Sequence, residues 1–130
     1  MIKDWLLLVG RVLVAVLFVP GGFSKMTHFA TTVAHIAKSP LPLPTLMAAG
    51  AVVVEFGVGL AFLLGWKARW AALILAVFTL AAGLLFHDFW ASPEAQMAMQ
   101  KVNFMKNLAI AGGLFFAYVF GPGRLSIDRG

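Results

Sequence analysis

The sequence predicts an all-α integral membrane protein: a four-helix bundle with a short interfacial helix between its first and second spans. Of the 130 residues, 62% are hydrophobic and only 12% are charged, and the mean hydropathy is +0.93. A soluble domain is only about 45–50% apolar. The apolar residues form four runs, and a run of about 20 residues spans a bilayer. We therefore expect a single transmembrane domain over residues 1–130, and neither a soluble enzyme nor a disordered chain.

The first apolar run begins at Trp5 and continues past Pro20 toward Met26. A secretory signal peptide is the competing interpretation, because Lys3 precedes the run. Arg11 lies inside the apolar region, however, and no clear small-x-small cleavage site follows it. Both features fit a signal peptide poorly, so we expect the segment to form the first span of the protein.

The segment between the first two spans, residues 27–44, is more polar than the runs on either side. Histidine, threonine and lysine alternate there with apolar residues, and Pro40, Pro42 and Pro44 follow. Apolar residues near helical spacing predict a short helix that lies on the membrane surface. The prolines predict an extended connection to the second span.

Three further spans are predicted at residues 45–64, 70–86 and 103–120. A basic turn at residues 65–69 joins the second and third spans. A polar loop at residues 91–102 precedes the fourth, and Ser92 is expected to cap a short helix within that loop. Four spans place both termini on one side of the membrane. A slight excess of lysine and arginine in the connections on that side predicts that it is cytoplasmic.

Arg11 and Glu55 lie deep within the spans, where an ionisable group is costly unless it is paired or solvated. From boundaries at Trp5 and Leu64, a rise of about 1.5 Å per residue puts Arg11 about 9 Å deep. The same rise puts Glu55 about 13 Å deep. We predict that Arg11 and Glu55 form a buried ion pair between the first and second spans. Such a pair has either a functional role or a purely structural one.

The helix face around Glu55 carries mostly small residues, among them Ala48, Ala51 and Gly59, and Gly57 lies close by. Small residues let a neighbouring helix approach closely in membranes. We therefore expect Glu55 to face another helix rather than lipid.

Further polar residues gather near the expected outer boundary of the membrane. Spacings of three and four residues place Asn103, Lys106 and Asn107 on one face of the fourth helix. His87 ends the third span at a similar depth. The alternative is that His87 is an ordinary interfacial residue and that Lys106 extends outward to water.

These outer residues are predicted to form one polar pocket, with Lys25 at its rim and Glu55 and Arg11 deeper. A quinone head group suits such a pocket, because its carbonyl oxygens accept hydrogen bonds from histidine, lysine or asparagine. Histidine can also exchange the proton that accompanies reduction of a quinone.

Other site classes receive little support from the sequence. His28 and His35 are seven residues apart, and no two histidines have the spacing of three or four that helical metal pairs use, so no metal site is expected. The chain has no cysteine, which excludes a disulfide or a thiol relay within it. The ten basic residues are scattered among apolar runs, so we expect no nucleic-acid binding.

Five longer motifs follow one another along the chain: GRVLVAVLFVPGGFSK, VEFGVGLAFLLG, FHDFW, FMKNLAIAGGL and GPGRLSID. In this order they resemble the DoxX family of small four-helix membrane proteins over nearly the whole chain. The matching positions are Arg11, Gly22, Lys25, Glu55, Gly57, Gly59, His87 and Asn107, with Gly121, Pro122 and Gly123 in the terminal motif.

The resemblance implies a helix bundle in the bacterial inner membrane and, more loosely, membrane oxidoreductase chemistry. Some members are subunits of a thiosulfate:quinone oxidoreductase. Side chains supply binding, orientation and protons, so a cofactor or a membrane or peripheral redox partner protein would carry the electrons. The first hypothesis is a quinone-interacting subunit whose ligand-binding residues are Arg11, Lys25, Glu55, His87, Lys106 and Asn107.

Two alternatives belong to other classes. The first is a non-catalytic scaffold or assembly factor, in which the same polar residues hold the helices in register. The second is proton-coupled transport of a small solute through Glu55, although the inverted halves and broken helices of many transporters are missing. The lipid bilayer is the expected partner in each case, and a homo-oligomer is also compatible with the sequence.

Overall fold

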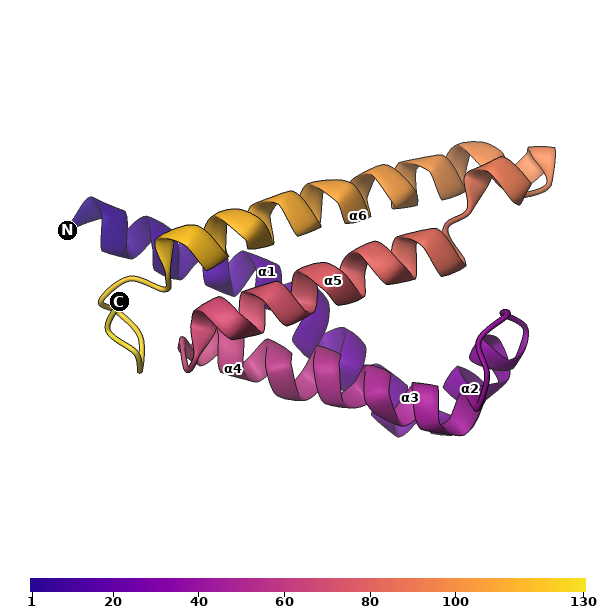
Figure 1. The fold of residues 1–130 in the computed structure, drawn as a ribbon, viewed down its shortest axis with the longest axis horizontal. Helices are drawn as coiled ribbons and strands as arrows, with labels where there is room; N and C mark the ends of the chain where they lie inside the picture. The colour runs from indigo at the N-terminus through magenta and orange to yellow at the C-terminus, as the bar shows by residue number, and fades with distance from the viewer.

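A computed structural model describes residues 1–130 and contains helices, turns and a terminal tail, with no strand. Four helical segments are long and apolar enough to cross a membrane: Ile2–Thr27, Pro44–Leu64, Ala68–Ala91 and Glu94–Phe120. They lie side by side, and both chain termini emerge at the same end of the bundle (Figure 1). The predicted fold class is confirmed.

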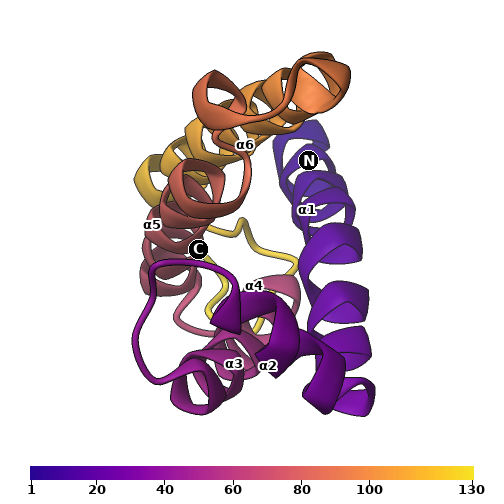
Figure 2. The same cartoon turned by 90° about the vertical axis from the view of Figure 1, so that its right-hand side faces the viewer.

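The first span is the single helix α1, Ile2–Thr27, which continues through Pro20. Proline is tolerated inside membrane helices because neighbouring groups satisfy the freed backbone carbonyls. One residue separates α1 from the short helix α2, Phe29–Ala37. Figure 2 shows α2 beside α3 at the end of the bundle that faces the viewer. A short helix between the first two spans is therefore present, as predicted.

The second span, Pro44–Leu64, consists of three helical pieces. They are α3, Pro44–Val52, then the π-helical segment η1, Val53–Val58, and then α4, Gly59–Leu64. Glu55 lies within η1. A π-helical segment is rare and often marks a functional site. Nothing in the residue pattern predicted it.

The third and fourth spans are α5, Ala68–Phe86, and α6, Glu94–Phe120, and the 3₁₀ turn η2, Phe89–Ala91, lies between them. A helix begins within the predicted loop at residues 91–102, as expected, but the loop itself is wrong: that helix starts at Glu94 and is α6, which runs on without a break to Phe120. Residues 94–102 contain no glycine or proline and consist mostly of good helix formers, so nothing stops the helix there. Ser92 does not cap α6 but donates a hydrogen bond to the Asp88 carbonyl, at 3.0 Å.

α5 is the central helix of the bundle, with α4 on one side and α6 on the other. Its buried face is rich in alanine, which lets both neighbours approach closely. The core between the helices is formed by Phe18, Phe62, Ala71, Ala72, Leu75, Ala76, Ala111 and Leu114. α1 packs against η1 and α4 but not closely against α6, so the bundle has a seam between its first and last helices.

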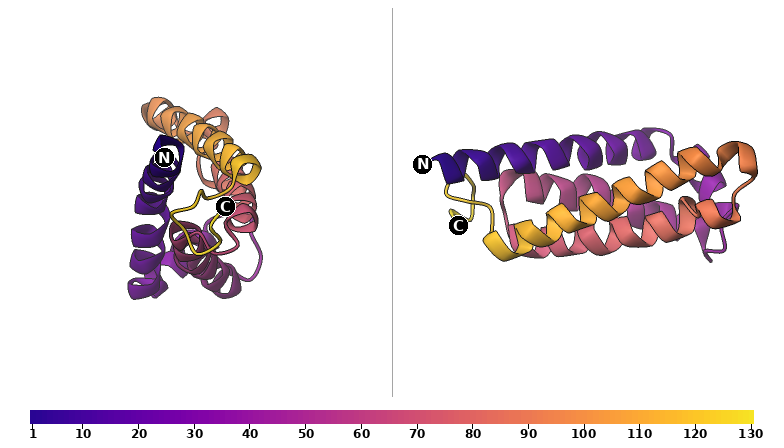
Figure 3. Two further views of the ribbon diagram at one scale, coloured as in Figure 1. Left: turned by 90° about the vertical axis from the view of Figure 1, so that its left-hand side faces the viewer. Right: turned by 90° about the horizontal axis from the view of Figure 1, so that it is seen from above.

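The bundle has two ends, the termini end and the far end. The termini end comprises the start of α1, the turn at residues 65–67 and the tail at residues 121–130, and Figure 3 shows this tail between α1 and α6. The far end comprises the end of α1, α2 and the start of α3, together with the connection from α5 to α6.

Candidate functional site

Two glycines fix how α1 lies against the second span. A Cβ atom on Gly22 would lie 2.5 Å from the Phe56 backbone nitrogen, and one on Gly59 would lie 3.2 Å from the Phe18 Cβ atom. The two backbones therefore meet at Gly22 and Gly59, as small residues in membrane helices allow. Gly57 does not share this role, because a Cβ atom there would meet nothing within 4 Å.

The predicted Arg11–Glu55 ion pair is wrong. Glu55 lies opposite Gly21 and Gly22, and a Cβ atom on Gly21 would be 3.3 Å from Glu55 Oε1. Eleven residues separate Arg11 from Gly22 on α1, which at about 1.5 Å per residue is roughly 16 Å. The prediction failed because Trp5 and Leu64 do not lie at the same depth: α1 extends past the end of α4.

Arg11 is instead held at the termini end by backbone carbonyls. Its guanidinium donates hydrogen bonds to the carbonyl oxygens of Leu63, Pro122 and Leu125, with a distance of 3.2 Å from Nε to Pro122. The residue is only 3% exposed. Arg11 thus ties α1 to the last turn of α4 and to the terminal tail.

The terminal motif GPGRLSID folds back under the bundle. Gly121 and Gly123 adopt φ values of +77° and +81°, in the left-handed region that favours glycine. The Asp128 carboxylate accepts hydrogen bonds at 2.9 Å from the backbone nitrogens of Lys67 and Ala68, which satisfies the first N–H groups of α5. Gly121, Pro122 and Gly123 therefore serve the fold of the tail.

The one ion pair of the protein joins Lys25, near the far end of α1, to Glu55 on η1. Lys25 Nζ lies 3.0 Å from Oε1 and 2.9 Å from Oε2 of Glu55. Glu55 is 7% exposed, whereas 40% of the Lys25 side chain is exposed. The carboxylate is therefore inside the protein, whereas its cationic partner is partly exposed at the surface.

The two carboxylate oxygens of Glu55 differ in their hydrogen bonding. Oε1 accepts a hydrogen bond from Lys25 Nζ, whereas Oε2 is buried and accepts none from any residue. The 2.9 Å approach of Nζ to Oε2 is thus an ionic contact without hydrogen-bond geometry. Buried polar atoms are almost always hydrogen-bonded. Oε2 is therefore an exception among buried polar atoms, because its one polar neighbour is the Lys25 ammonium at 2.9 Å.

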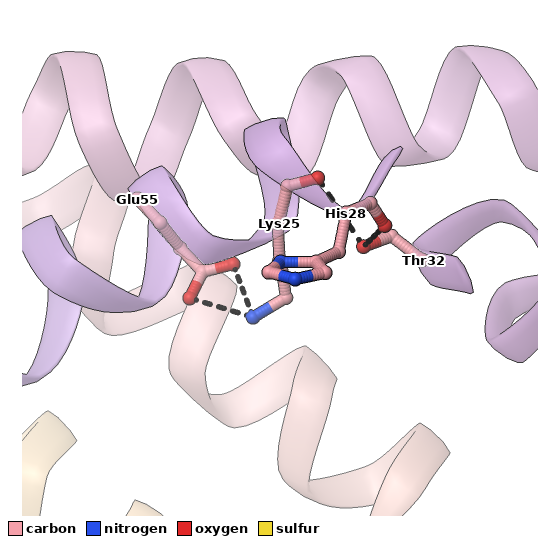
Figure 4. Close-up of polar contacts among 4 residues, drawn as sticks. All are labelled: Lys25, His28, Thr32 and Glu55. Atoms are coloured by element: carbon pink, nitrogen blue, oxygen red, sulfur yellow. Dashed lines mark hydrogen bonds and ion pairs between the residues drawn. The ribbon is translucent and has the colours of Figure 1, made fainter. Parts of the chain in front are cut away.

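The corner between α1 and α2 surrounds Lys25 with further polar groups. The Thr32 hydroxyl donates to the carbonyls of Lys25 and His28, at 3.4 and 3.1 Å. Figure 4 shows these bonds and both Lys25–Glu55 contacts. These bonds fix the backbone of the corner and so help to direct Lys25 toward Glu55.

The remaining predicted ligand residues serve mainly to join α5 to α6. His87 Nδ1 lies 2.8 Å from Gln100 Oε1, and the Asn107 amide donates to the Thr79 carbonyl at 3.1 Å. The Lys106 side chain is exposed and makes no polar contact. No hydrogen bond or ion pair joins these side chains to Glu55, so the structure brings together only Lys25 and Glu55.

Comparison with known proteins agrees with this architecture. The DoxX family pattern matches residues 6–88. Inner membrane protein YphA of Escherichia coli is 35% identical over 124 residues, which cover 95% of this chain and 89% of YphA. Inner membrane protein YqjF of the same organism is 38% identical over 128 residues, covering 98% of this chain and 93% of YqjF.

A more distant relative is the ER-derived vesicles protein ERV29 of Saccharomyces cerevisiae. It is 25% identical over 127 residues, which cover 98% of this chain but only 34% of ERV29. No solved structure matches the chain.

Proposed function

Because this chain belongs to the DoxX family of membrane proteins, we propose that it binds the head group of a membrane quinone at Lys25 and Glu55, as a subunit of a membrane redox system. One observation carries the proposal. Glu55 is a buried carboxylate in a π-helical segment, with one oxygen that accepts no hydrogen bond and a half-exposed lysine as its only cationic partner.

The Lys25–Glu55 pair is better explained by ligand binding than by stability. A buried ion pair stabilises a protein only when its geometry is excellent and its remaining lone pairs are satisfied. Oε2 of Glu55 is left without a hydrogen bond, and the Lys25 ammonium donates only to Oε1. The pair therefore keeps one acceptor and at least one donor for a further partner.

A quinone head group matches these free groups. The Lys25 ammonium has three N–H donors and can hydrogen-bond to a quinone carbonyl while it keeps its contact with Glu55. Oε2 of Glu55 can accept a hydrogen bond from a hydroxyl group of the reduced quinone and exchange a proton with that group. The quinone itself supplies the two-electron chemistry when bound. The chain binds and orients the head group, and lipid accommodates the apolar tail.

The test is to purify the protein in detergent, extract its lipids and quantify ubiquinone and menaquinone by chromatography. The native protein should retain quinone, and Lys25→Met and Glu55→Gln should each lose at least about 90% of it, since one charge-assisted hydrogen bond is worth about tenfold in affinity. Lys106→Met is the matched control, because that lysine is exposed and makes no polar contact. The proposal fails if the native protein retains no more quinone than Lys25→Met, or if Lys106→Met loses as much.

A non-catalytic scaffold is the second candidate, and one observation favours it. Arg11, His87 and Asn107 are all engaged in hydrogen bonds that join helices or hold the tail. Polar groups used in this way set the register of a bundle and need no ligand. A scaffold predicts a native protein free of quinone that co-purifies with a constant partner protein from its own membrane.

A further inference from the structure

Two cavities adjoin each other at the termini end of the bundle, away from Lys25 and Glu55. The first, of about 170 Å³, lies along the seam between α1 and α6 and is lined mostly by apolar residues. The second, of about 310 Å³, has a mostly polar lining. Leu7 and Phe120 belong to both linings, so the two cavities adjoin. Together they are called the groove: its mouth is polar, and its interior is mostly apolar with Arg11 in the lining.

Four cations surround the polar mouth: Lys3, Arg69, Arg124 and Arg129. Asp4 is the only acidic side chain in the lining, and its carboxylate accepts a hydrogen bond from the Arg124 backbone nitrogen, at 3.1 Å. None of the four cations forms an ion pair, since the one ion pair of the protein is Lys25–Glu55. Arg69 donates to the carbonyls of Tyr118 and Val119, and the other three side chains make no hydrogen bond. The mouth therefore carries excess positive charge.

The apolar part of the groove exists because two glycines face it. Gly10 on α1 and Gly113 on α6 both line the cavity, and a Cβ atom on either would meet nothing within 4 Å. Glycines in membrane helices commonly serve to bring two helices into contact. Here they do not, because α1 and α6 do not pack closely together. The missing side chains leave room for an apolar occupant that comes from outside the chain.

We propose that this groove binds one anionic phospholipid, with the phosphate among Lys3, Arg124 and Arg129 and an acyl chain beside Gly10 and Gly113. Basic pockets between transmembrane helices suit acidic lipid head groups, because charge attraction adds to burial of the apolar tail. A zwitterionic lipid would bring its own ammonium group near the four cations. A second copy of this chain is a poor occupant, because a two-fold interface would bring two equally basic mouths together.

The experiment compares phosphatidylglycerol with phosphatidylcholine as added lipid. Bound lipids are counted by native mass spectrometry of the detergent-purified protein, and the thermal midpoint is measured at rising lipid concentration. We expect one tightly retained phosphatidylglycerol and a rise in midpoint that phosphatidylcholine does not match. Arg124→Gln combined with Arg129→Gln should weaken the binding of phosphatidylglycerol about 30-fold, because each basic residue near the head group contributes about fivefold.

Gly113→Leu tests the apolar part of the groove and Gly112→Leu is its matched control. Both glycines lie in α6 with open space beside them, but only Gly113 lines the cavity, so both variants should fold. Gly113→Leu should lower retention of phosphatidylglycerol at least tenfold, and Gly112→Leu should leave it unchanged.

Three results would overturn the assignment. The first is equal retention of the two lipids by the native protein. The second is loss of a dimer, rather than of lipid, in Gly113→Leu. The third is loss of bound quinone in Gly113→Leu, which would place the quinone in this groove. Failure of the quinone site at Lys25 and Glu55 leaves the lipid assignment intact, because the two sites share no residue.

Discussion

The two buried charged residues of the spans, Arg11 and Glu55, lie toward opposite ends of the bundle and are satisfied to different degrees. Arg11 donates to three backbone carbonyls. Glu55 has one hydrogen bond, from a lysine that is 40% exposed, and its other oxygen has none. Burial is costly for both charged groups. The two differ in how many of their hydrogen-bonding atoms have a partner. We expect the saturated charge to hold the fold together, and we propose that the unsaturated one binds a ligand.

The largest expected effect concerns the side of the membrane that each end of the bundle faces. Chemical labelling of the two ends should give an all-or-none difference. The chain has no cysteine, so single cysteines can be placed at exposed positions of each end. Ile2→Cys lies at the termini end and Ala95→Cys at the far end. A membrane-impermeant maleimide applied to spheroplasts should label Ala95→Cys at once and Ile2→Cys only after permeabilisation, because the bias in basic residues predicts cytoplasmic termini. The reverse pattern would put the quinone site at the cytoplasmic boundary.

Loss of the Arg11 side chain should cause the largest loss of stability. Arg11→Leu leaves the carbonyls of Leu63, Pro122 and Leu125 without their donor, and hydrogen bonds to charged groups are worth about 1.5–3 kcal/mol each. We expect the free energy of unfolding in detergent to fall by about 3 kcal/mol or more and the tail to become sensitive to proteases. Lys106→Leu, which removes an exposed cation, should change stability by less than about 0.5 kcal/mol. Equal losses of stability in Arg11→Leu and Lys106→Leu would contradict the role of Arg11 in tying α1 to α4 and the tail.

The spans could be predicted because the bilayer imposes a physical length. A run of about 20 apolar residues is needed to cross it, and four such runs are visible in the sequence. The start of α6 was missed because residues 94–102 are polar enough to resemble a loop, although their helix propensity is high. Hydropathy reports where a chain meets lipid, and it does not report where a helix begins.

The site could be predicted only in part, because depth along one helix does not fix contacts with another. The ends of the apolar runs at Trp5 and Leu64 suggested equal depth, whereas the contacts at Gly22 and Gly59 set a different register. The glycine pair at residues 21–22 was the available signal for a close approach at that level. The partners of Arg11 are backbone carbonyls, which no pattern of side-chain types reveals.

The close approach at Gly22 should matter for stability, whereas Gly57 should not. Gly22→Ala brings a Cβ atom to 2.5 Å from the Phe56 backbone nitrogen, so α1 must shift away from η1. We expect a loss of about 1–3 kcal/mol in unfolding free energy, as overpacking generally costs. Gly57→Ala is the matched control, because open space surrounds that position. It should be neutral or stabilise the helix by roughly 0.5–1 kcal/mol. A neutral Gly22→Ala would mean that the register at Glu55 is set elsewhere.

Neutralising Glu55 should have the smallest effect on stability among the substitutions at buried polar residues, and this separates Glu55 most clearly from Arg11. Glu55→Gln keeps an oxygen that accepts the hydrogen bond of Lys25, so the unfolding free energy should fall by less than about 1 kcal/mol. Lys25→Met leaves the buried Glu55 carboxylate without its cationic partner. It should therefore lower the unfolding free energy by about 1–2 kcal/mol more than Glu55→Gln does. The double variant should recover most of that difference, because no charge is then left unpaired. If Glu55→Gln alone is as costly as Arg11→Leu, both charges hold the fold together and the distinction by hydrogen-bond saturation fails.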